Sequence, residues 1–455
     1  MFRYTLRNIL IGSITPAMST LGKKEPLTST VLMERARELA ASGEMQQAEQ
    51  AYAEALKLSP RQPEALNFLG MCAVRRGEAV IGTSLVKKAS DLQPGNAAIL
   101  CNLGLCYESA GEWESALGVF RRALEAMPRF YDARLHLAYA LEQLGRGHEA
   151  LTHYFGAIFA AQGEGHWMSE SSVPANLRPL IEHAMGYVNE GRRALFDAVL
   201  EPLREQHGRN ALGRVEHCLA AYLREIPTQY ADPRQRPTFL HFPDMPAQPY
   251  LSRGLFPWIE EYEASTAAIR EELAAVLTAD RNLEPVHQGL SAAEQSRLLH
   301  SAAGTPMWDA FFFHRHGASY QDNCQRCPRT MEALERLPIA RIREHAPEIF
   351  FSVLRPDTHI LPHRGVSNIR IVTHLPLLVP ADCALRVAEE THEWNEGRVV
   401  AFDDTYEHEA WNRGNQTRVV LIADVWNPYL TEVERAALAQ LVGSIGDFNR
   451  ACGIG

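Results

Sequence analysis

The sequence predicts a multidomain α + β protein, in which an α-helical solenoid is followed by an antiparallel β domain of jelly-roll type. Three observations support this fold class: glycines that recur every 34 residues in the first third, a cluster of prolines at 227–249, and short β-rich runs in the last quarter. With 455 residues the chain is long enough for two or three domains.

The first third is an internal repeat, and the same residue types recur at matching positions of each unit. Glycine repeats with a spacing of 34 at Gly43, Gly77, Gly111 and Gly145, and proline does so at Pro60, Pro94 and Pro128. Small residues follow the same period, and apolar residues between them are spaced as on one face of a helix. The unit resembles the tetratricopeptide repeat, and we expect such repeats over residues 30–163.

Stacked repeats of this kind form a short solenoid, and its concave face commonly holds a peptide. We therefore expect a peptide or protein partner to bind there. The alternative is a structural spacer or a surface for self-association.

A helical pattern without the 34-residue spacing continues beyond the repeats, at Leu177–Glu190, Arg193–Glu205 and Arg214–Leu223. We interpret residues 164–235 as a helical connector. Six prolines within residues 227–249 are incompatible with a helix interior, so a domain boundary is expected there. Residues 1–29 lack periodicity and are predicted to be a flexible N-terminus, while residues 442–455 are predicted to form a C-terminal tail.

Composition excludes several classes of protein. The formal net charge is −10, which argues against a nucleic-acid-binding surface. No apolar run is long enough for a membrane span. The eight cysteines are scattered through a long chain, unlike the dense framework of a small secreted domain, so we expect a cytoplasmic protein.

Residues 236–441 are predicted to form the β domain, because several short β-rich runs are separated by turn sequences such as Asn395–Gly397. The predicted strands are Ile349–Leu354, Ile369–Leu378, Leu385–Ala388, Val399–Phe402 and Arg418–Val425. A sandwich or barrel of this type is open at one end, where a metal ion and a small ligand can bind.

Two histidines and one arginine in this domain are candidates for such a site. His363 and His408 have the contexts Leu-Pro-His-Arg-Gly and Tyr-Glu-His-Glu-Ala-Trp, and Arg418 begins the next apolar run after His408. Non-haem iron oxygenases bind Fe(II) through imidazoles and keep positions open for other ligands, and a guanidinium suits a carboxylate. We expect Glu407–Trp411 and Arg418–Ala423 to be paired strands that bring His408 and Arg418 to one cavity.

The order of motifs in this region resembles the aspartyl/asparaginyl β-hydroxylase family, over about residues 236–441. The resemblance rests on Phe351-Ser352, Pro362-His363-Arg364-Gly365, Asn368-Ile369-Arg370, His374-Leu375, Trp394–Gly397, Phe402–Asp404, His408–Trp411, Arg418 and Asp424–Pro428. It implies a double-stranded β-helix (a jelly-roll or cupin-like fold), and a dioxygenase that uses Fe(II), 2-oxoglutarate and O₂ to hydroxylate Cβ of an Asp or Asn residue.

The resemblance also implies roles for individual residues. His363 and His408 match the two iron ligands, and Arg418 matches the residue that pairs with the distal carboxylate of 2-oxoglutarate. Ser352 and His374 match residues that hold the same cosubstrate. Where most of the superfamily has a third ligand, an Asp two residues after the first histidine, this chain has Gly365, as in the animal members of the family. Asp404 is the candidate to orient an iron-bound water without itself binding the metal.

One position departs from the family pattern. Two residues after Arg370 the peptide hydroxylases usually carry a second arginine, and here Val372 takes its place. Arg370 remains the candidate for binding the carboxylate or amide of the substrate. We expect a peptide or protein substrate to be recruited by the repeats. Alternatives are a hydroxylase of a lipid acyl chain or small molecule, and a repeat scaffold with an idle oxygenase domain.

Overall fold

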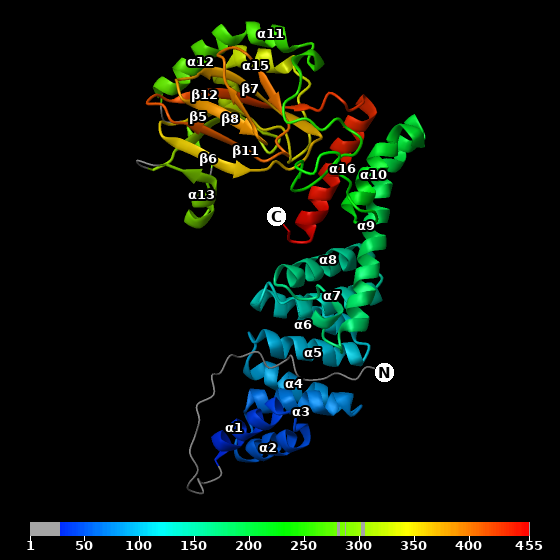
Figure 1. Cartoon of the computed structure of the whole chain (residues 1–455). Helices are drawn as coiled ribbons and strands as arrows, with labels where there is room; N and C mark the ends of the chain where they lie inside the picture. The colour runs from blue at the N-terminus through cyan, green and yellow to red at the C-terminus, as the bar shows by residue number, and fades with distance from the viewer. Residues whose placement is uncertain (1–27, 280–282, 287, 302–304, 455) are drawn as a thin grey trace. The chain divides into compact units, whose positions relative to one another are not determined.

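The computed structural model describes residues 28–454, apart from 280–282, 287 and 302–304 (Figure 1). Most of the N-terminus predicted to be flexible therefore lies outside the described residues. The chain divides into two compact units, one comprising Met1–Arg192 with Phe448–Gly455 and the other Arg193–Asp447. Among the described residues no helix is long and apolar enough to cross a membrane.

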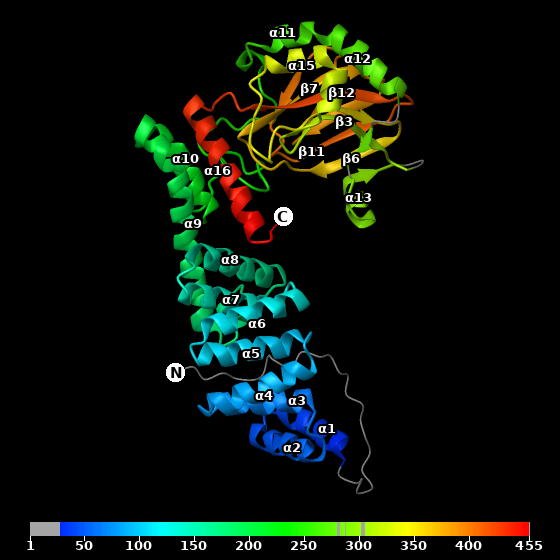
Figure 2. The same ribbon diagram turned by 180° about the vertical axis from the view of Figure 1, so that it is seen from behind.

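The first unit is a stack of helix pairs, which confirms the predicted solenoid (Figure 2). The described helices over the repeats are α1 (Ser29–Ala41), α2 (Met45–Leu58), α3 (Pro63–Arg75), α4 (Ala79–Leu92), α5 (Ala97–Ser109), α6 (Trp113–Ala126), α7 (Tyr131–Gln143) and α8 (Gly147–Gly163). Each periodic glycine lies in the turn inside a pair and has a positive φ, such as 84° at Gly43 and 73° at Gly145. The 34-residue period therefore marks a backbone conformation that favours glycine.

The helix that follows is longer than the sequence predicts. Leu177–Glu190 and Arg193–Glu205 were expected to be separate, yet one helix, α9 (Arg178–His207), covers both. The helix continues through Gly191, where an added Cβ would lie 2.7 Å from Leu151 Cδ1, so the glycine allows close packing. α10 (Gly213–Tyr222) follows in the second unit.

Two antiparallel sheets form the core of the second unit. The larger sheet has seven strands, β1 (Glu284–Pro285), β3 (Trp308–Arg315), β4 (Ala318–Ser319), β5 (Ile349–Leu354), β7 (Arg370–Leu378), β10 (Val400–Phe402) and β12 (Arg418–Trp426). The smaller sheet has five, β2 (Leu299–His300), β6 (Thr358–His363), β8 (Cys383–Val387), β9 (Glu390–Glu393) and β11 (His408–Asn412). The central order in the larger sheet is β3-β5-β12-β7-β10 and in the smaller β6-β11-β8.

Helices cover the outer face of the larger sheet, while its inner face packs on the smaller sheet (Figure 1). The covering helices are α11 (Ile259–Ala264), α12 (Thr266–Ala279) and α15 (Pro328–Glu335). The remaining helices of this unit are α13 (Ala292–Leu298), α14 (Gln321–Arg326) and α16 (Glu432–Ala451), whose last residues belong to the first unit.

Because side chains alternate along each strand, the larger sheet has an apolar face under the helices and a face with polar side chains toward the smaller sheet. On β7, Ile371 and Leu375 belong to the helix-covered core, whereas Val372 packs between the sheets. Because successive side chains point to opposite faces, Arg370 and His374 share the inner face with Val372. By the same alternation Ser352 on β5 and both Arg418 and Asp424 on β12 face the space between the sheets. The polar residues of the larger sheet thus converge on one interior.

The expected pairing of the His408 and Arg418 strands is wrong. β11 pairs with β6 and β8, whereas β12 pairs with β5 and β7. The turn at Asn412–Gly414 passes from one sheet to the other and does not close a hairpin. His408 and Arg418 therefore approach the same interior from opposite sheets.

An irregularity in β6 directs His363 inward. Ala410, Trp411 and Asn412 keep a constant register with β6, but His408 pairs with His363 one residue out of that register. The extra residue in β6 is a β-bulge, and a bulge reverses which face the next side chain takes. His363 consequently faces the interior together with Ile360, although strict alternation would place it outside.

Candidate active site

The two candidate iron ligands lie side by side. His363 ends β6 and His408 begins β11, and their ring centroids are 4.1 Å apart. Each ring donates from Nδ1 to a backbone carbonyl two residues earlier, His363 to Leu361 O at 2.8 Å and His408 to Tyr406 O at 3.0 Å. Because a carbonyl oxygen only accepts, the proton is on Nδ1 in both rings, which leaves both Nε2 lone pairs available to a metal ion.

Burial keeps both imidazoles in the neutral form that binds metals. It lowers the pKa of His363, an effect that the nearby Asp404 carboxylate opposes. Burial and the neighbouring His363 lower the pKa of His408 to about 3. In the described part of the chain no group of three His, Cys, Asp or Glu side chains gathers at metal-binding distance. This donor set is a two-imidazole site with open positions, which fits Fe(II).

Asp404 takes the space that a side chain at position 365 would need. A Cβ built on Gly365 would overlap the Asp404 carboxylate, and the Gly365 N–H donates to the Asp404 carbonyl at 2.6 Å. Asp404 is 5% exposed, and its Oδ1 has no hydrogen-bond partner among the described residues. The predicted role of Asp404 agrees with this placement, because the free oxygen can accept from a metal-bound water.

Arg418 lies in the interior without an acidic partner. It is 1% exposed, and its Nη1 donates to Ser352 Oγ at 3.1 Å and to Ser352 O at 3.3 Å. The guanidinium also lies 4.8 Å from the Trp394 ring centroid. Burial lowers its pKa to about 10, and no described Asp or Glu forms an ion pair with it. A buried guanidinium is costly unless an anion compensates it, so this position is suited to a carboxylate ligand.

Further unsatisfied polar atoms surround Arg418. Among the described residues Arg418 Nε, His374 Nδ1 and Trp394 Nε1 are buried and lack hydrogen-bond partners. Trp308 of β3 donates from Nε1 to Ser352 Oγ at 2.9 Å. Since buried polar groups are nearly always bonded in proteins, this cluster fits a polar, anionic ligand such as 2-oxoglutarate.

Aromatic rings connect the imidazole pair to the arginine end. Phe402 lies 5.5 Å from His408 and 5.0 Å from His374, measured between ring centroids, and His374 lies 5.9 Å from Trp394. Burial and the Arg418 charge hold the pKa of His374 well below its usual value. The structure therefore brings His363, His408, Arg418 and the two predicted cosubstrate residues, Ser352 and His374, into one continuous site.

Arg370, the predicted substrate residue, is already engaged. Its Nη2 lies 3.1 Å from Asp404 Oδ2, and its Nη1 donates to Asp424 Oδ1 at 2.9 Å. Burial alone would lower the pKa of Arg370, but the two carboxylates together raise it. The sequence pointed to Asp424 only as part of the motif Asp424–Pro428, without a role of its own. The available signal was an acidic residue on the inner face of an otherwise apolar strand.

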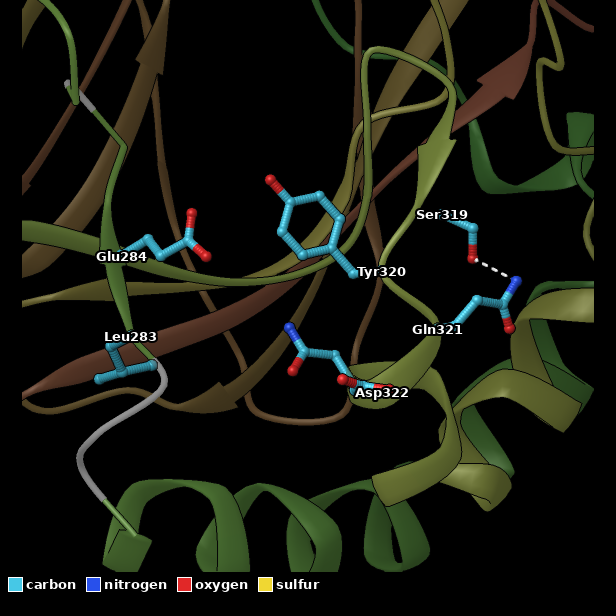
Figure 3. A pocket seen from close by; sticks show the side chains of 7 residues that line it. Leu283, Glu284, Ser319, Tyr320, Gln321 and Asp322 are labelled. Carbon is cyan, nitrogen blue, oxygen red and sulfur yellow. Dashed lines mark hydrogen bonds between the residues drawn. The ribbon is translucent and has the colours of Figure 1, made fainter.

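Two other features lie apart from this site. The Asp403 carboxylate accepts from Gln235 Nε2 at 2.6 Å and from Thr405 N at 3.0 Å. Its oxygens are therefore engaged outside the imidazole site. A polar hollow of about 390 Å³ is lined by Leu283, Glu284 and residues 319–323. Gln321 donates to Ser319 there at 3.2 Å, and Figure 3 shows how the two side chains lie. None of the site residues lines this hollow.

Comparison with known proteins agrees with these features. Residues 263–428 match the model of the family described as Aspartyl/Asparaginyl beta-hydroxylase, and residues 33–80 and 97–130 match tetratricopeptide repeat models. All the candidate site residues lie within 263–428. Two compact units, one of helical repeats and one with a buried imidazole pair, thus define a repeat protein with an oxygenase-like domain.

Residues 263–428 are thus similar to the aspartyl/asparaginyl β-hydroxylase family, and tetratricopeptide repeats precede them. Human aspartyl/asparaginyl beta-hydroxylase is 27% identical over 394 residues, which cover 85% of this chain and 45% of that protein. Human aspartate beta-hydroxylase domain-containing protein 2 is 28% identical over 55% of this chain and 66% of that protein.

An ornithine lipid ester-linked acyl 2-hydroxylase from Rhizobium tropici is 34% identical over 183 residues, which cover 40% of this chain and 61% of that protein. The chain spans about half the length of the human and mouse aspartyl/asparaginyl beta-hydroxylases that it matches.

Proposed function

We propose that the second unit is an Fe(II)- and 2-oxoglutarate-dependent dioxygenase that hydroxylates Cβ of an Asp or Asn residue in a peptide or protein held by the repeats. The observation that carries the proposal is the buried Arg418, which has no acidic partner among the described residues. It lies in the same interior as two imidazoles whose Nδ1 atoms donate to backbone carbonyls. The family match of residues 263–428 and the hydroxylase relatives support it.

Each residue has a distinct task in this proposal. His363 and His408 hold Fe(II) through Nε2. Arg418 and Ser352 bind the distal carboxylate of 2-oxoglutarate, and His374 borders the same cosubstrate. When bound, Fe(II) and 2-oxoglutarate would activate O₂, of which one oxygen atom enters the substrate and the other succinate, with release of CO₂.

The surrounding protein keeps the site dry and oriented. Phe402, Val420 and Ile422 line the interior between the sheets and are at most 9% exposed. Asp404 Oδ1, which has no partner among the described residues, would accept a hydrogen bond from a metal-bound water. Exclusion of bulk water strengthens the charge interactions of Arg418 with its ligand.

In this proposal the repeats bind the substrate chain. Binding a remote part of the substrate chain raises the effective concentration of the target residue at the iron. A second candidate is hydroxylation of a lipid acyl chain, which the similarity to the Rhizobium tropici enzyme favours. Val372, 8% exposed on the inner face, is also compatible with an uncharged substrate group.

The test is anaerobic titration of the full chain with Fe(II) and 2-oxoglutarate, followed by the weak visible charge-transfer band of the chelate. We expect a band that requires both additions and that is lost in His408→Ala. A well-folded protein that gives no band would contradict the proposal. With the band established, peptides retained by the full chain are tested for a mass increase of one oxygen on Asp or Asn, with acyl lipids as the competing substrates.

A further inference from the structure

Arg370 and Asp424 form a buried chain of charges that ends at Asp404. Arg370 Nη1 donates to Asp424 Oδ1 at 2.9 Å, and Nη2 lies 3.1 Å from Asp404 Oδ2. The side chains of Asp404 and Asp424 are only 7% and 2% exposed, and that of Arg370 is 13% exposed. Ion pairs with so little solvent are weakly screened, so each charge strongly constrains its neighbour.

The chain is anchored to the backbone at its far end. Asp424 Oδ2 accepts from the Glu348 N–H at 2.9 Å, next to the first residue of β5. Asp424 itself lies within β12, where it pairs with Val372 of β7. A carboxylate fixed by a strand and by a backbone donor fixes the guanidinium that binds it.

The two oxygens of Asp404 consequently have different tasks. Oδ2 faces Arg370, whereas Oδ1 has no hydrogen-bond partner among the described residues. Gly365 provides the space for this carboxylate next to His363. We propose that Arg370 and Asp424 are positioning residues, which hold Asp404 so that its Oδ1 faces the open side of the imidazole pair. This inference rests on the function proposed above.

The geometry does not favour the predicted use of Arg370 as an anchor for a substrate carboxylate. One positive charge is shared by two carboxylates, so an additional acidic group would find no unbalanced positive charge at this point. The next inward residue on β7 is Val372, which offers no cation either. The same charges instead suit a rigid support for Asp404.

The test measures metal binding, not turnover. Apo-protein is titrated with Fe(II) under anaerobic conditions, without 2-oxoglutarate, in wild type, Asp424→Asn and Arg370→Lys. Asn keeps the shape but loses the charge, and Lys keeps the charge but cannot bridge two carboxylates. We expect the Fe(II) dissociation constant to rise about tenfold in each, since outer-sphere partners typically contribute that much to metal affinity.

Asp309→Asn is the matched control. Asp309 is 7% exposed and lies 3.2 Å from Arg355, whose side chain is 32% exposed, so this variant also removes a buried carboxylate from an ion pair at the same sheet. It should bind Fe(II) as wild type does. Thermal midpoints are recorded for every variant, and if Asp424→Asn does not fold, Arg370→Lys decides the question.

A double-mutant cycle tests whether Asp424 affects Fe(II) binding through Asp404. If Asp424 acts through Asp404, the variant Asp404→Asn with Asp424→Asn should bind Fe(II) no more weakly than Asp404→Asn alone. Additive losses, or unchanged affinity in Asp424→Asn and Arg370→Lys, would overturn the inference and leave the proposed function intact. A wild-type protein without an Fe(II)- and 2-oxoglutarate-dependent band would instead remove the proposed function, and this inference with it.

Discussion

At the residue scale, Arg418 is expected to matter for ligand binding but not for the stability of the fold. It is 1% exposed, and no described carboxylate compensates its charge. Replacement of a buried charge by an apolar side chain of similar volume is often neutral or stabilising. We therefore expect Arg418→Met to abolish the 2-oxoglutarate charge-transfer band, while the free energy of unfolding stays unchanged or rises by up to about 2 kcal/mol. Urea unfolding and the anaerobic titration measure the two quantities on the same sample.

Arg253 provides the opposite case. Its guanidinium pairs with Glu263 at 2.6 Å, and the Glu263 side chain is 9% exposed. Arg253→Met would leave that carboxylate with less compensation, so it should lower stability but keep the band. A parallel loss of stability in Arg418→Met would show that Arg418 has a structural role.

Gly365 offers a second test at this scale. Because a Cβ would overlap the Asp404 carboxylate, Gly365→Ala should displace Asp404 and weaken Fe(II) binding by about tenfold. The double variant Gly365→Asp with Asp404→Ala moves the carboxylate to the other side of the same space. We expect it to recover Fe(II) affinity, measured by anaerobic titration. Unchanged Fe(II) affinity in Gly365→Ala would mean that the site does not depend on this carboxylate.

At the element scale, strand alternation explains what the sequence predicts well. The apolar runs of β5, β7 and β12 begin and end within one residue of the expected bounds, because both faces of these strands are buried. Polar residues in such runs are conspicuous, and Ser352, His374 and Arg418 all face the interior.

The parts that sequence reasoning missed depend on long-range geometry. The bulge that turns His363 inward is visible only against its partner β11, and local sequence does not specify it. The turn after β11 resembles a hairpin turn, yet it leads into the opposite sheet. The sequence identified Arg370 as a candidate site residue, but it did not identify the two carboxylates that bind it. These come from β12 and from the loop after β10.

The proline-rich segment supports the site, although its composition indicated only a boundary. Gln235 donates to Asp403 at 2.6 Å, the Arg236 N–H to Thr405 O at 2.9 Å, and the Thr238 N–H to Gly365 O at 3.0 Å. Proline removes a backbone donor and resists helix, so this segment bonds to neighbouring loops in an extended form. It thereby connects the two loops that carry Gly365 and Asp404.

The contribution of Asp403 to the stability of the fold is expected to depend on pH. Burial, followed by the nearby Asp404 charge, raises the pKa of Asp403 to about 6. The unfolded chain releases this proton near pH 3.9, so between that value and pH 6 the folded state binds more protons. Stability from this group is therefore complete below about pH 4 and is lost as the pH rises, by about 1.4 kcal/mol per pH unit.

Asp403→Asn should remove that slope. Urea unfolding of wild type and variant at several pH values between 4 and 7 measures it, and the difference in unfolding free energy should shift in favour of the variant as the pH rises. The Gln235 amide can turn to bond the new side chain. A difference that does not change with pH would contradict the predicted titration.

At the scale of the whole molecule, the two units have separate cores. The repeats are stabilised by contacts between neighbouring helices, whereas the second unit depends on two sheets and their covering helices. We therefore expect substitutions in one core to leave the other core unchanged, so that the two halves of the proposed function can be tested separately.

Two glycines test this independence. At Gly70 a Cβ would lie 2.9 Å from the Gly82 carbonyl and 2.5 Å from Val86 Cγ2, where two helices of one repeat cross. Gly70→Ala should destabilise the first unit by about 1–3 kcal/mol through overpacking. Gly118, within α6, would have nothing within 4 Å of an added Cβ. Gly118→Ala should thus stabilise the unit by up to about 1 kcal/mol, since alanine favours helix.

Calorimetry of the full chain measures both effects. We expect the transition of the first unit to move down in Gly70→Ala and up in Gly118→Ala, with the transition of the second unit unmoved. The chelate band should keep its intensity in both variants, because none of its residues lies in the repeats. A single transition that moves as a whole would mean that the units unfold together. A weakened band in Gly70→Ala would show that the repeats also support the proposed iron site.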